Sequence, residues 1–286
     1  MSALSERGGV LWALFDGQEL WSVHLAAGQA FQRVGDGHEW AWSRVARLEG
    51  LRGACVAGTR AGVLVGTGEA RLLRLEGEAL KPLPGFDTAD GRAAWYTPWG
   101  GPPDTRSITG NDHAIFVNVH VGGVLRSSDG GTSWEPTIDI HADVHRVLAH
   151  PLLPGRIYAA CAGGLAVSDD DGDSWTIHAG GLHARYCRAV AVIGDRVLVS
   201  ASQGPGGQRS ALYRGAVDGS GLERCRTGLP DWFDRNIDSL CLDASSAAGL
   251  AAFGTATGSV YASVDEGATW ELAAEGLPPV TCLALT

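Results

Sequence analysis

An eight-residue pattern that occurs three times limits the folds open to this chain more than any other feature. The pattern is Ser-x-Asp-x-Gly-x-Ser/Thr-Trp, with five fixed positions, and it occupies residues 127–134, 168–175 and 263–270. Trp134 and Trp175 are 41 residues apart, and Trp175 and Trp270 are 95 apart, which is two periods of about 47. A degenerate copy at 212–220 fills the gap. A period of this length is typical of a repeat architecture.

The residue types in the pattern are those of a tight turn between two strands. An Asp side chain accepts hydrogen bonds from backbone N–H groups of its own turn, and Gly supplies a positive φ angle. The Ser or Thr hydroxyl holds the start of the next strand, and the Trp fills the space between neighbouring sheets. We therefore expect a structural role for the aspartates and tryptophans of the three copies, Asp129, Asp170, Asp265, Trp134, Trp175 and Trp270.

These segments resemble the Asp-box, or BNR, repeat of sialidase-type β-propellers. The resemblance implies that each copy lies between the third and fourth strands of a propeller blade, away from the ligand site. It also implies that the repeated aspartates are not catalytic acids.

Short apolar runs separated by Gly, Pro and Asp turns precede each copy, which predicts four strands per blade. The 41 glycines among 286 residues fit a chain with many turns. We predict an all-β fold, a single six-bladed propeller over residues 1–286 with four-stranded antiparallel blades. The C-terminal run is expected to complete the first blade and so close the ring. The expected blades are 280–286 with 10–34, then 51–83, 106–137, 143–178, 186–225 and 237–272.

Charge and composition exclude several classes of function. The net charge is −10 and no basic stripe is evident, so a nucleic-acid partner is disfavoured. No apolar run approaches the ~18 residues of a membrane span, so no membrane partner is expected. The N-terminus lacks the pattern of a signal peptide. The six cysteines are scattered without CxxC spacing. We therefore expect a cytoplasmic protein in which the cysteines are small buried residues.

The expected inner strands place arginine at one shared position in four blades, and a fifth blade has Asp238 there. Guanidinium groups suit carboxylates and phosphates, which predicts a central site for a small anionic molecule or an acidic peptide. The alternative is a set of structural ion pairs with nearby aspartates. Loops rich in aromatic and ionisable residues on the same face add Trp99, Asp234 and Asn236 as binding candidates. The four arginines are Arg52, Arg106, Arg146 and Arg188.

Three histidines are expected on this face in consecutive blades. If His120, His145 and His183 converge, they suit Zn, Cu or Fe as a bound divalent metal. A single one of them beside a carboxylate suits acid–base catalysis instead. A purely structural role is the third interpretation. Tyr186 lies near these residues in the expected fold and is a further catalytic candidate.

Two classes of function remain open. One is an enzyme or binding protein for a small anionic metabolite. Sialidase-type propellers bind a carboxylate with three arginines and use a tyrosine nucleophile, and Arg106, Arg146, Arg188 and Tyr186 match those residue types. No Arg-Ile-Pro motif occurs near the N-terminus, so sialidase activity is disfavoured. The other class is a non-catalytic recognition or assembly module, because Asp-box propellers also resemble photosystem II assembly factors and sorting-receptor propellers.

Overall fold

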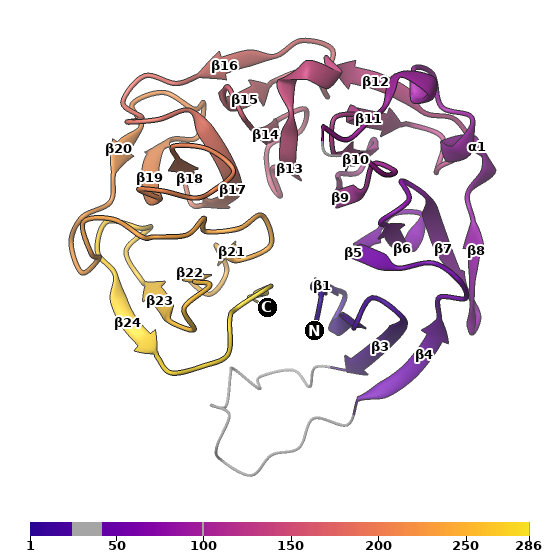
Figure 1. The fold of residues 1–286 in the computed structure, drawn as a ribbon, viewed down its shortest axis with the longest axis horizontal. Helices are drawn as coiled ribbons and strands as arrows, with labels where there is room; N and C mark the ends of the chain where they lie inside the picture. Colours follow the sequence, from indigo (N-terminus) through magenta and orange to yellow (C-terminus); the bar gives the residue numbers. More distant parts are fainter. Residues whose placement is uncertain (25–41, 99, 286) are drawn as a thin grey trace.

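The chain folds into six four-stranded antiparallel sheets arranged in a ring around a central axis (Figure 1). The computed structural model describes residues 1–24, 42–98 and 100–285. Within each sheet the strands follow chain order, so every blade is a meander. The prediction of a six-bladed β-propeller is confirmed. The first strand of each blade lies nearest the axis and the fourth lies at the circumference.

The first three blades comprise strands β1 to β12. The first blade contains β1 (Ala3–Arg7), β2 (Val10–Phe15), β3 (Glu19–His24) and β4 (Ser43–Arg47). The second contains β5 (Gly53–Thr59), β6 (Gly62–Thr67), β7 (Leu72–Glu76) and β8 (Ala79–Pro82). The third contains β9 (Thr105–Gly110), β10 (Ile115–Val119), β11 (Gly123–Ser127) and β12 (Glu135–Ile138).

The last three blades comprise strands β13 to β24. The fourth blade contains β13 (Val144–Ala149), β14 (Ile157–Cys161), β15 (Gly164–Ser168) and β16 (Thr176–His178). The fifth contains β17 (Tyr186–Ile193), β18 (Arg196–Ser202), β19 (Ala211–Ala216) and β20 (Glu223–Arg224). The sixth contains β21 (Leu242–Ser245), β22 (Leu250–Gly254), β23 (Val260–Ser263) and β24 (Glu271–Ala274).

The first blade corrects the expected ring closure. Its inner strand is β1, which pairs with β2 from Ala3↔Leu14 to Arg7↔Val10, so the C-terminal run does not complete this blade. The sequence Ala-Leu-Ser-Glu-Arg is too polar to stand out as a strand. The C-terminal run instead follows the sixth blade, where Leu283 N–H donates to the Leu240 carbonyl at 2.8 Å. The part of the expected first blade at 25–34 lies outside the described residues.

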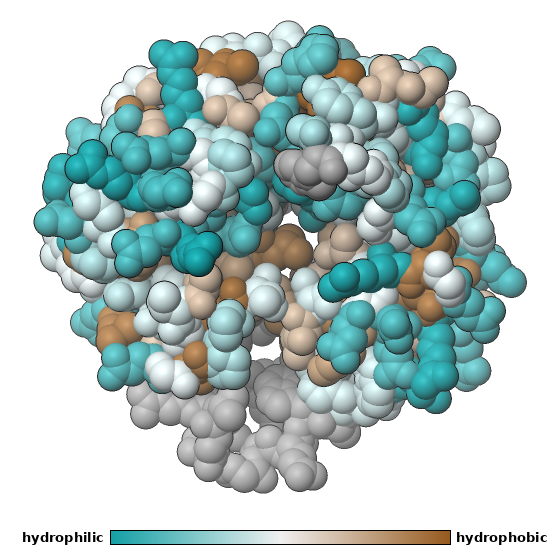
Figure 2. Space-filling view, viewed as in Figure 1, coloured by the Kyte–Doolittle hydropathy of each residue, from teal (hydrophilic) through white to brown (hydrophobic). Residues whose placement is uncertain are grey.

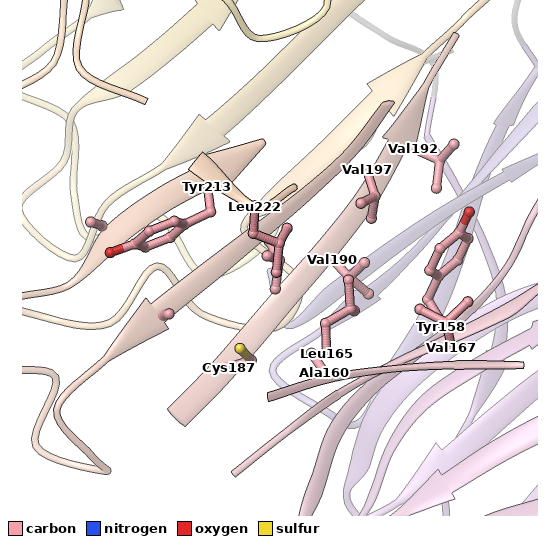
Figure 3. Packing of buried hydrophobic residues seen from close by; sticks show 13 residues of the cluster. Tyr158, Ala160, Leu165, Val167, Cys187, Val190, Val192, Val197, Tyr213 and Leu222 are labelled. Atoms are coloured by element: carbon pink, nitrogen blue, oxygen red, sulfur yellow. The ribbon is translucent and has the colours of Figure 1, made fainter. Parts of the chain in front are cut away.

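The hydrophobic core is divided into clusters that lie between consecutive blades. Five such clusters join the first blade to the second and so on through the fifth and sixth. Figure 3 shows the cluster between the fourth and fifth blades, where Tyr158 and Leu165 face Val190, Val197 and Tyr213. Both tyrosines are almost fully buried. Because strand side chains alternate between faces, each sheet contributes one face to the cluster before it and one to the cluster after it.

The three repeated segments form turns with the same hydrogen bonds, and we call them the Asp turns. In the turn at 168–175, the Ser168 hydroxyl donates to Asp170 Oδ1 at 2.8 Å and accepts from Gly172 N–H at 2.8 Å. Asp170 also accepts from the Ser174 N–H and hydroxyl, at 2.8 and 2.6 Å. Hydrogen bonds to the carboxylate from Ser174 and Ser168 hold the pKa of Asp170 at about 2. The Asp170 carboxylate is therefore ionised and accepts hydrogen bonds within its own turn.

The other two Asp turns repeat this arrangement. Ser127 and Ser263 donate to Asp129 and Asp265 at 2.9 and 2.8 Å. Hydrogen bonds lower the pKa of both aspartates, that of Asp265 to about 2. The indole N–H groups of the tryptophans that end two of the turns donate to backbone carbonyls within the turns at 3.1 Å.

The described helices are short. They are α1 (Pro84–Asp87) and the 3₁₀ segments η1 (Arg92–Ala94) and η2 (Ile140–Ala142). Within the described ranges, no helix has the length and apolar character needed to cross a membrane. Five of the six cysteines are buried and all six are free thiols, as the sequence predicted.

Candidate functional site

Two of the inner-strand arginines are each paired with an aspartate. Arg106 Nε on β9 donates to Asp104 Oδ2 at 3.2 Å. Arg188 Nε on β17 donates to Asp238 Oδ1 at 2.9 Å. The arginine side chains are 17% and 19% exposed, and the aspartates are 32% and 53% exposed. A molecule approaching these pairs therefore meets the carboxylates more readily than the guanidinium groups.

Two buried histidines and one half-buried aspartate lie between these pairs. Asp104 Oδ1 is 3.5 Å from His120 Nδ1, and the other ring nitrogen of His120 is 3.3 Å from Asp143 Oδ1. Asp143 Oδ2 is in turn 3.6 Å from His145 Nε2. The two imidazole centroids are 6.5 Å apart. His145 Nδ1 lies 2.6 Å from the Cys187 carbonyl oxygen, which accepts a hydrogen bond from that nitrogen.

The electrostatic surroundings of the two histidines differ. Burial opposes protonation of His120, but the carboxylates Asp104 and Asp143 outweigh it and raise the pKa of His120. At His145 burial dominates, helped by the charge of Arg188, and lowers the pKa. Burial acts to raise the pKa of Asp143, yet the two imidazoles hold it well below its usual range. Asp143 therefore stays ionised while its two neighbours favour opposite charge states.

Tyr186 connects the histidines to Arg188. Its ring centroid lies 4.6 Å from that of His145, and Arg188 Nη1 lies 3.5 Å from the tyrosine hydroxyl. The contacts thus form a continuous series from the third blade to Asp238, which lies in the loop before the sixth blade. We call this series the rim network; it comprises Asp104, Arg106, His120, Asp143, His145, Tyr186, Arg188 and Asp238.

His183 occupies a different environment from the other two candidate histidines. Its Nδ1 lies 2.6 Å from the Tyr213 hydroxyl, and its ring centroid is 4.6 Å from that of Trp232. The expected convergence of three histidines is therefore limited to His120 and His145. Across the described residues, no three His, Cys, Asp or Glu side chains are arranged to hold a metal ion. His183 precedes β17 and contacts Tyr213 of its own blade and Trp232 of the following loop instead.

The remaining binding candidates have separate surroundings. Asn236 accepts from the Ser202 hydroxyl at 2.6 Å and donates to the Pro205 carbonyl at 3.1 Å, so its amide joins two loops. Asp234 is exposed on the second of these loops. Trp99 lies outside the described residues.

Arg146 differs from the other inner-strand arginines because it extends into the central channel. Its Nη1 donates to the carbonyls of Ser239 and Leu242, both at 2.6 Å, and so connects β13 to the inner edge of the sixth blade. It makes no salt bridge with any residue in the described ranges. Burial lowers its pKa, and the charge of Asp243 acts in the opposite direction.

A cavity of about 290 Å³ surrounds Arg146 within the channel. Its walls come from inner strands and from the C-terminal run, which contributes Leu283, Ala284 and Leu285. Most of the lining residues are apolar, but polar atoms form the larger part of the exposed cavity surface. Figure 2 shows a largely hydrophilic face with apolar residues in the depth of the central opening.

Two acidic residues also line this cavity. Glu6 accepts from the Gly9 N–H at 2.9 Å, which holds its carboxylate to the β1–β2 turn. Burial raises the pKa of Asp243, whose Oδ2 accepts from the Leu285 N–H at 2.8 Å. Asp243 makes no salt bridge with Arg146 within the described residues, although its charge acts on the guanidinium.

Sequence reasoning found the arginine position but missed the cavity. Alignment of the inner strands treated the four arginines as equivalent, whereas the partners that distinguish them come from other blades. The sequence does not predict the C-terminal wall of the cavity either, because its pattern places that run in the first blade. Nothing in the local sequence signals either contact.

Comparisons with known proteins relate this chain to other propellers by structure. No family model matches the sequence, and no curated protein matches it. The structure titled "YCF48 bound to D1 peptide" is 14% identical, with a TM-score of 0.59 and coverage of 95% of this chain and 81% of that one. The WD40 β-propeller domain of Doa1 is 12% identical, with a TM-score of 0.64 and coverage of 96% and 80%. YCF48 from Cyanidioschyzon merolae is 15% identical, with a TM-score of 0.54 and coverage of 92% and 83%.

These similarities define the class of protein as a β-propeller. At such low identity they carry information about the fold and not about a ligand or a reaction. The function must therefore be argued from the channel cavity and the rim network themselves.

Proposed function

We propose that this propeller binds a small anionic molecule, carrying a carboxylate or a phosphate, in its central channel. The observation that carries the proposal is that Arg146 faces a channel cavity of about 290 Å³ without a salt-bridge partner in the described residues. A charged group taken out of bulk water favours a counter-charge. Arg106 and Arg188 already have one in Asp104 and Asp238.

The chemistry of the cavity wall agrees with such a ligand. Binding sites for small molecules are concave and mostly apolar, with a few polar groups that fix orientation. Here the apolar part comes from residues such as Val56, Ile108 and Leu148, and Thr109 supplies a hydroxyl group that accepts from the Ala149 N–H at 3.1 Å and can still donate. The Arg146 fork provides the single strong recognition element for an oxyanion.

Thermal-shift screening of small mono- and dicarboxylates and phosphate monoesters, followed by calorimetry, tests the proposal. Arg146→Met keeps the length of the side chain and removes its charge. We expect it to weaken a channel ligand by about tenfold or more, since a charge-assisted hydrogen bond contributes roughly 1.5–3 kcal/mol. Circular dichroism checks the fold, because Arg146 also joins two blades.

Arg188→Met is the matched control, because it removes an inner-strand guanidinium outside the channel cavity. It should leave the affinity of a channel ligand unchanged. Loss of binding in Arg188→Met and not in Arg146→Met would contradict the channel site. So would the absence of binding by every anion in the panel.

A second candidate function is recognition of a polypeptide by the rim network. The three Asp turns support assignment to the Asp-box propellers, whose resemblance to assembly factors favours such a role. The aspartates Asp104 and Asp238 are more exposed than their arginine partners, which favours a basic segment over the acidic peptide expected from the sequence. Fluorescence anisotropy with Lys-rich and Glu-rich peptides, on the wild type and on Asp238→Asn, distinguishes the two charges.

A further inference from the structure

A groove of about 400 Å³ separates the fifth and sixth blades, and four arginines line it. It runs from β19 and β20 to the Asp turn of the sixth blade, which contributes Gly267 and Ala268. Glu223 also lines the groove, and Glu266 lies beside Arg196 and Arg214. The arginines are Arg196, Arg214, Arg224 and Arg226.

An equivalent arginine in the third blade allows a direct comparison. Arg126 on β11 lies opposite Glu135 in the register of the outer strand pair, just as Arg214 on β19 lies opposite Glu223. Both arginines donate to the backbone carbonyl of the fourth residue in the Asp turn of the next blade. Arg126 Nη1 reaches the Asp171 carbonyl at 2.8 Å. Arg214 Nε reaches the Glu266 carbonyl at 2.7 Å.

The two arginines differ in their acidic partners. In the third blade, Arg126 pairs with Glu135 and with Asp173 of the next Asp turn, both at 2.7 Å. These two carboxylates neutralise the charge of the guanidinium and accept its hydrogen bonds. The position of Asp173 in its turn corresponds to Ala268 in the last turn, as the aligned segments 168–175 and 263–270 show.

The corresponding groove at the fifth blade is therefore open. Within the described ranges, Glu223 makes no ion pair with Arg214. The nearest acidic group to Arg214 is Glu266, whose Oε2 lies 3.8 Å from Nη2. The Arg214 guanidinium is therefore held by a backbone carbonyl and shares one carboxylate with Arg196, whereas Arg126 has two carboxylates within 2.7 Å.

Of the other three arginines, Arg196 and Arg226 retain hydrogen-bonding capacity toward the groove. Arg196 pairs with Asp195 at 3.1 Å and lies 4.0 Å from Glu266. Arg224 lies opposite Tyr213 in the strand pair, so its side chain is on the other face of the sheet from Arg214. Its guanidinium pairs with Asp231 at 3.1 Å and lies 3.9 Å from the Trp232 ring centroid, so it does not act with Arg214 in the groove. Arg226 is exposed and makes no ion pair in the described part of the chain.

We propose that this groove binds a phosphate monoester. A phosphate monoester carries close to two negative charges and three acceptor oxygens, so it can engage several guanidinium groups at once. A single carboxylate of the kind present in the third blade carries one charge and two oxygens. The site is separate from the channel cavity and shares no residue with it.

Isothermal titration calorimetry with inorganic phosphate tests the site, and a phosphoserine peptide with its unphosphorylated form distinguishes the source of the phosphate. We expect inorganic phosphate and the phosphoserine peptide to bind, and the unphosphorylated peptide not to bind. Binding should weaken with added NaCl because the groove is accessible to solvent. If the phosphoserine peptide binds more tightly than inorganic phosphate, the ligand is a phosphorylated polypeptide. If only inorganic phosphate binds, the ligand is a free phosphate compound.

The decisive variant is Ala268→Asp. It introduces, beside Arg214, a carboxylate equivalent to that of Asp173, which pairs with Arg126 at the third blade. Ala268 is exposed and the same turn accepts aspartate at Asp173, so the fold should be retained. We expect at least about a tenfold loss of phosphate affinity, and a similar loss in Arg226→Ala. Thr132→Asp introduces the same charge at the matching position of the first Asp turn and should leave the affinity unchanged.

Three results would overturn the proposal. The first is no phosphate binding by the wild type. The second is wild-type affinity in folded Ala268→Asp, and the third is an equal loss in Thr132→Asp. Arg146→Met should keep its phosphate affinity in this groove, so failure of the channel proposal and failure of the groove proposal are distinguishable.

Discussion

Arg126 of the third blade donates a hydrogen bond to the backbone carbonyl of Asp171 in the fourth, with Nη1 and the oxygen 2.8 Å apart. The contact joins a third strand to the Asp turn of the next blade, and the same guanidinium binds two carboxylates. The repeated sequence thus connects blades as well as the strands within one blade.

Replacing Arg126 with Gln should destabilise the ring. The variant loses the inter-blade hydrogen bond and both ion pairs of a side chain that is only 17% exposed. We expect a loss of roughly 1–3 kcal/mol in the free energy of unfolding. Urea denaturation should show a lower midpoint with an unchanged slope. Arg74→Gln, which removes a surface pair with Glu76, is the control and should change stability by less than about 0.5 kcal/mol.

The Asp turns should make stability depend on pH in the acid range. The folded-state pKa values of Asp170 and Asp265 are about 2, below the ordinary 3.8. Because the folded pKa is depressed, the contribution of each is present above pH 4 and is lost as the pH falls toward 2. The stability difference between the wild type and Asp170→Asn should therefore shrink over this range in urea titrations. A difference that stays constant from pH 5 to pH 2 would argue against ionised turns.

His120 and His145 should titrate on opposite sides of pH 6.5. The carboxylates raise the pKa of His120 against its burial, and burial lowers that of His145. Stability from charged His120 is present below pH 6.5 and is lost as the pH rises through its folded pKa. Stability from neutral His145 is present above pH 6.5 and is lost as the pH falls. Imidazole NMR titration measures both values directly.

Asp143→Asn supplies the control for this titration, since the carboxylate is shared by the two rings. The pKa of His120 should fall in the variant, because one of its two stabilising charges is removed. An unchanged His120 titration would mean that Asp143 does not act on it.

Gly228 should be far less tolerant of substitution than Gly276. Both have positive φ angles, 80° and 73°, so alanine is strained at either position. At Gly228 an added Cβ would also lie 1.6 Å from the Trp270 carbonyl oxygen, whereas nothing lies within 4 Å at Gly276. We expect Gly276→Ala to cost about 1–2 kcal/mol and Gly228→Ala to cost considerably more. Equal midpoints in thermal unfolding would contradict the packing of this turn.

The local sequence contained the information for the blades. Each Asp turn depends on hydrogen bonds among residues at most four positions apart, such as Ser168, Asp170 and Ser174. Each blade is a meander of short strands with short connections. Such local patterns can be read from the chain directly, and their count predicted six blades.

Contacts between blades were decided by tertiary structure alone. The inner-strand arginines look alike in sequence, yet Arg106 and Arg188 meet aspartates while Arg146 meets only backbone carbonyls of the sixth blade. The separation of His183 from His145 has the same origin. Their partners lie tens of residues away and approach only when the ring forms, so no periodicity in the sequence specifies which charges remain unpaired.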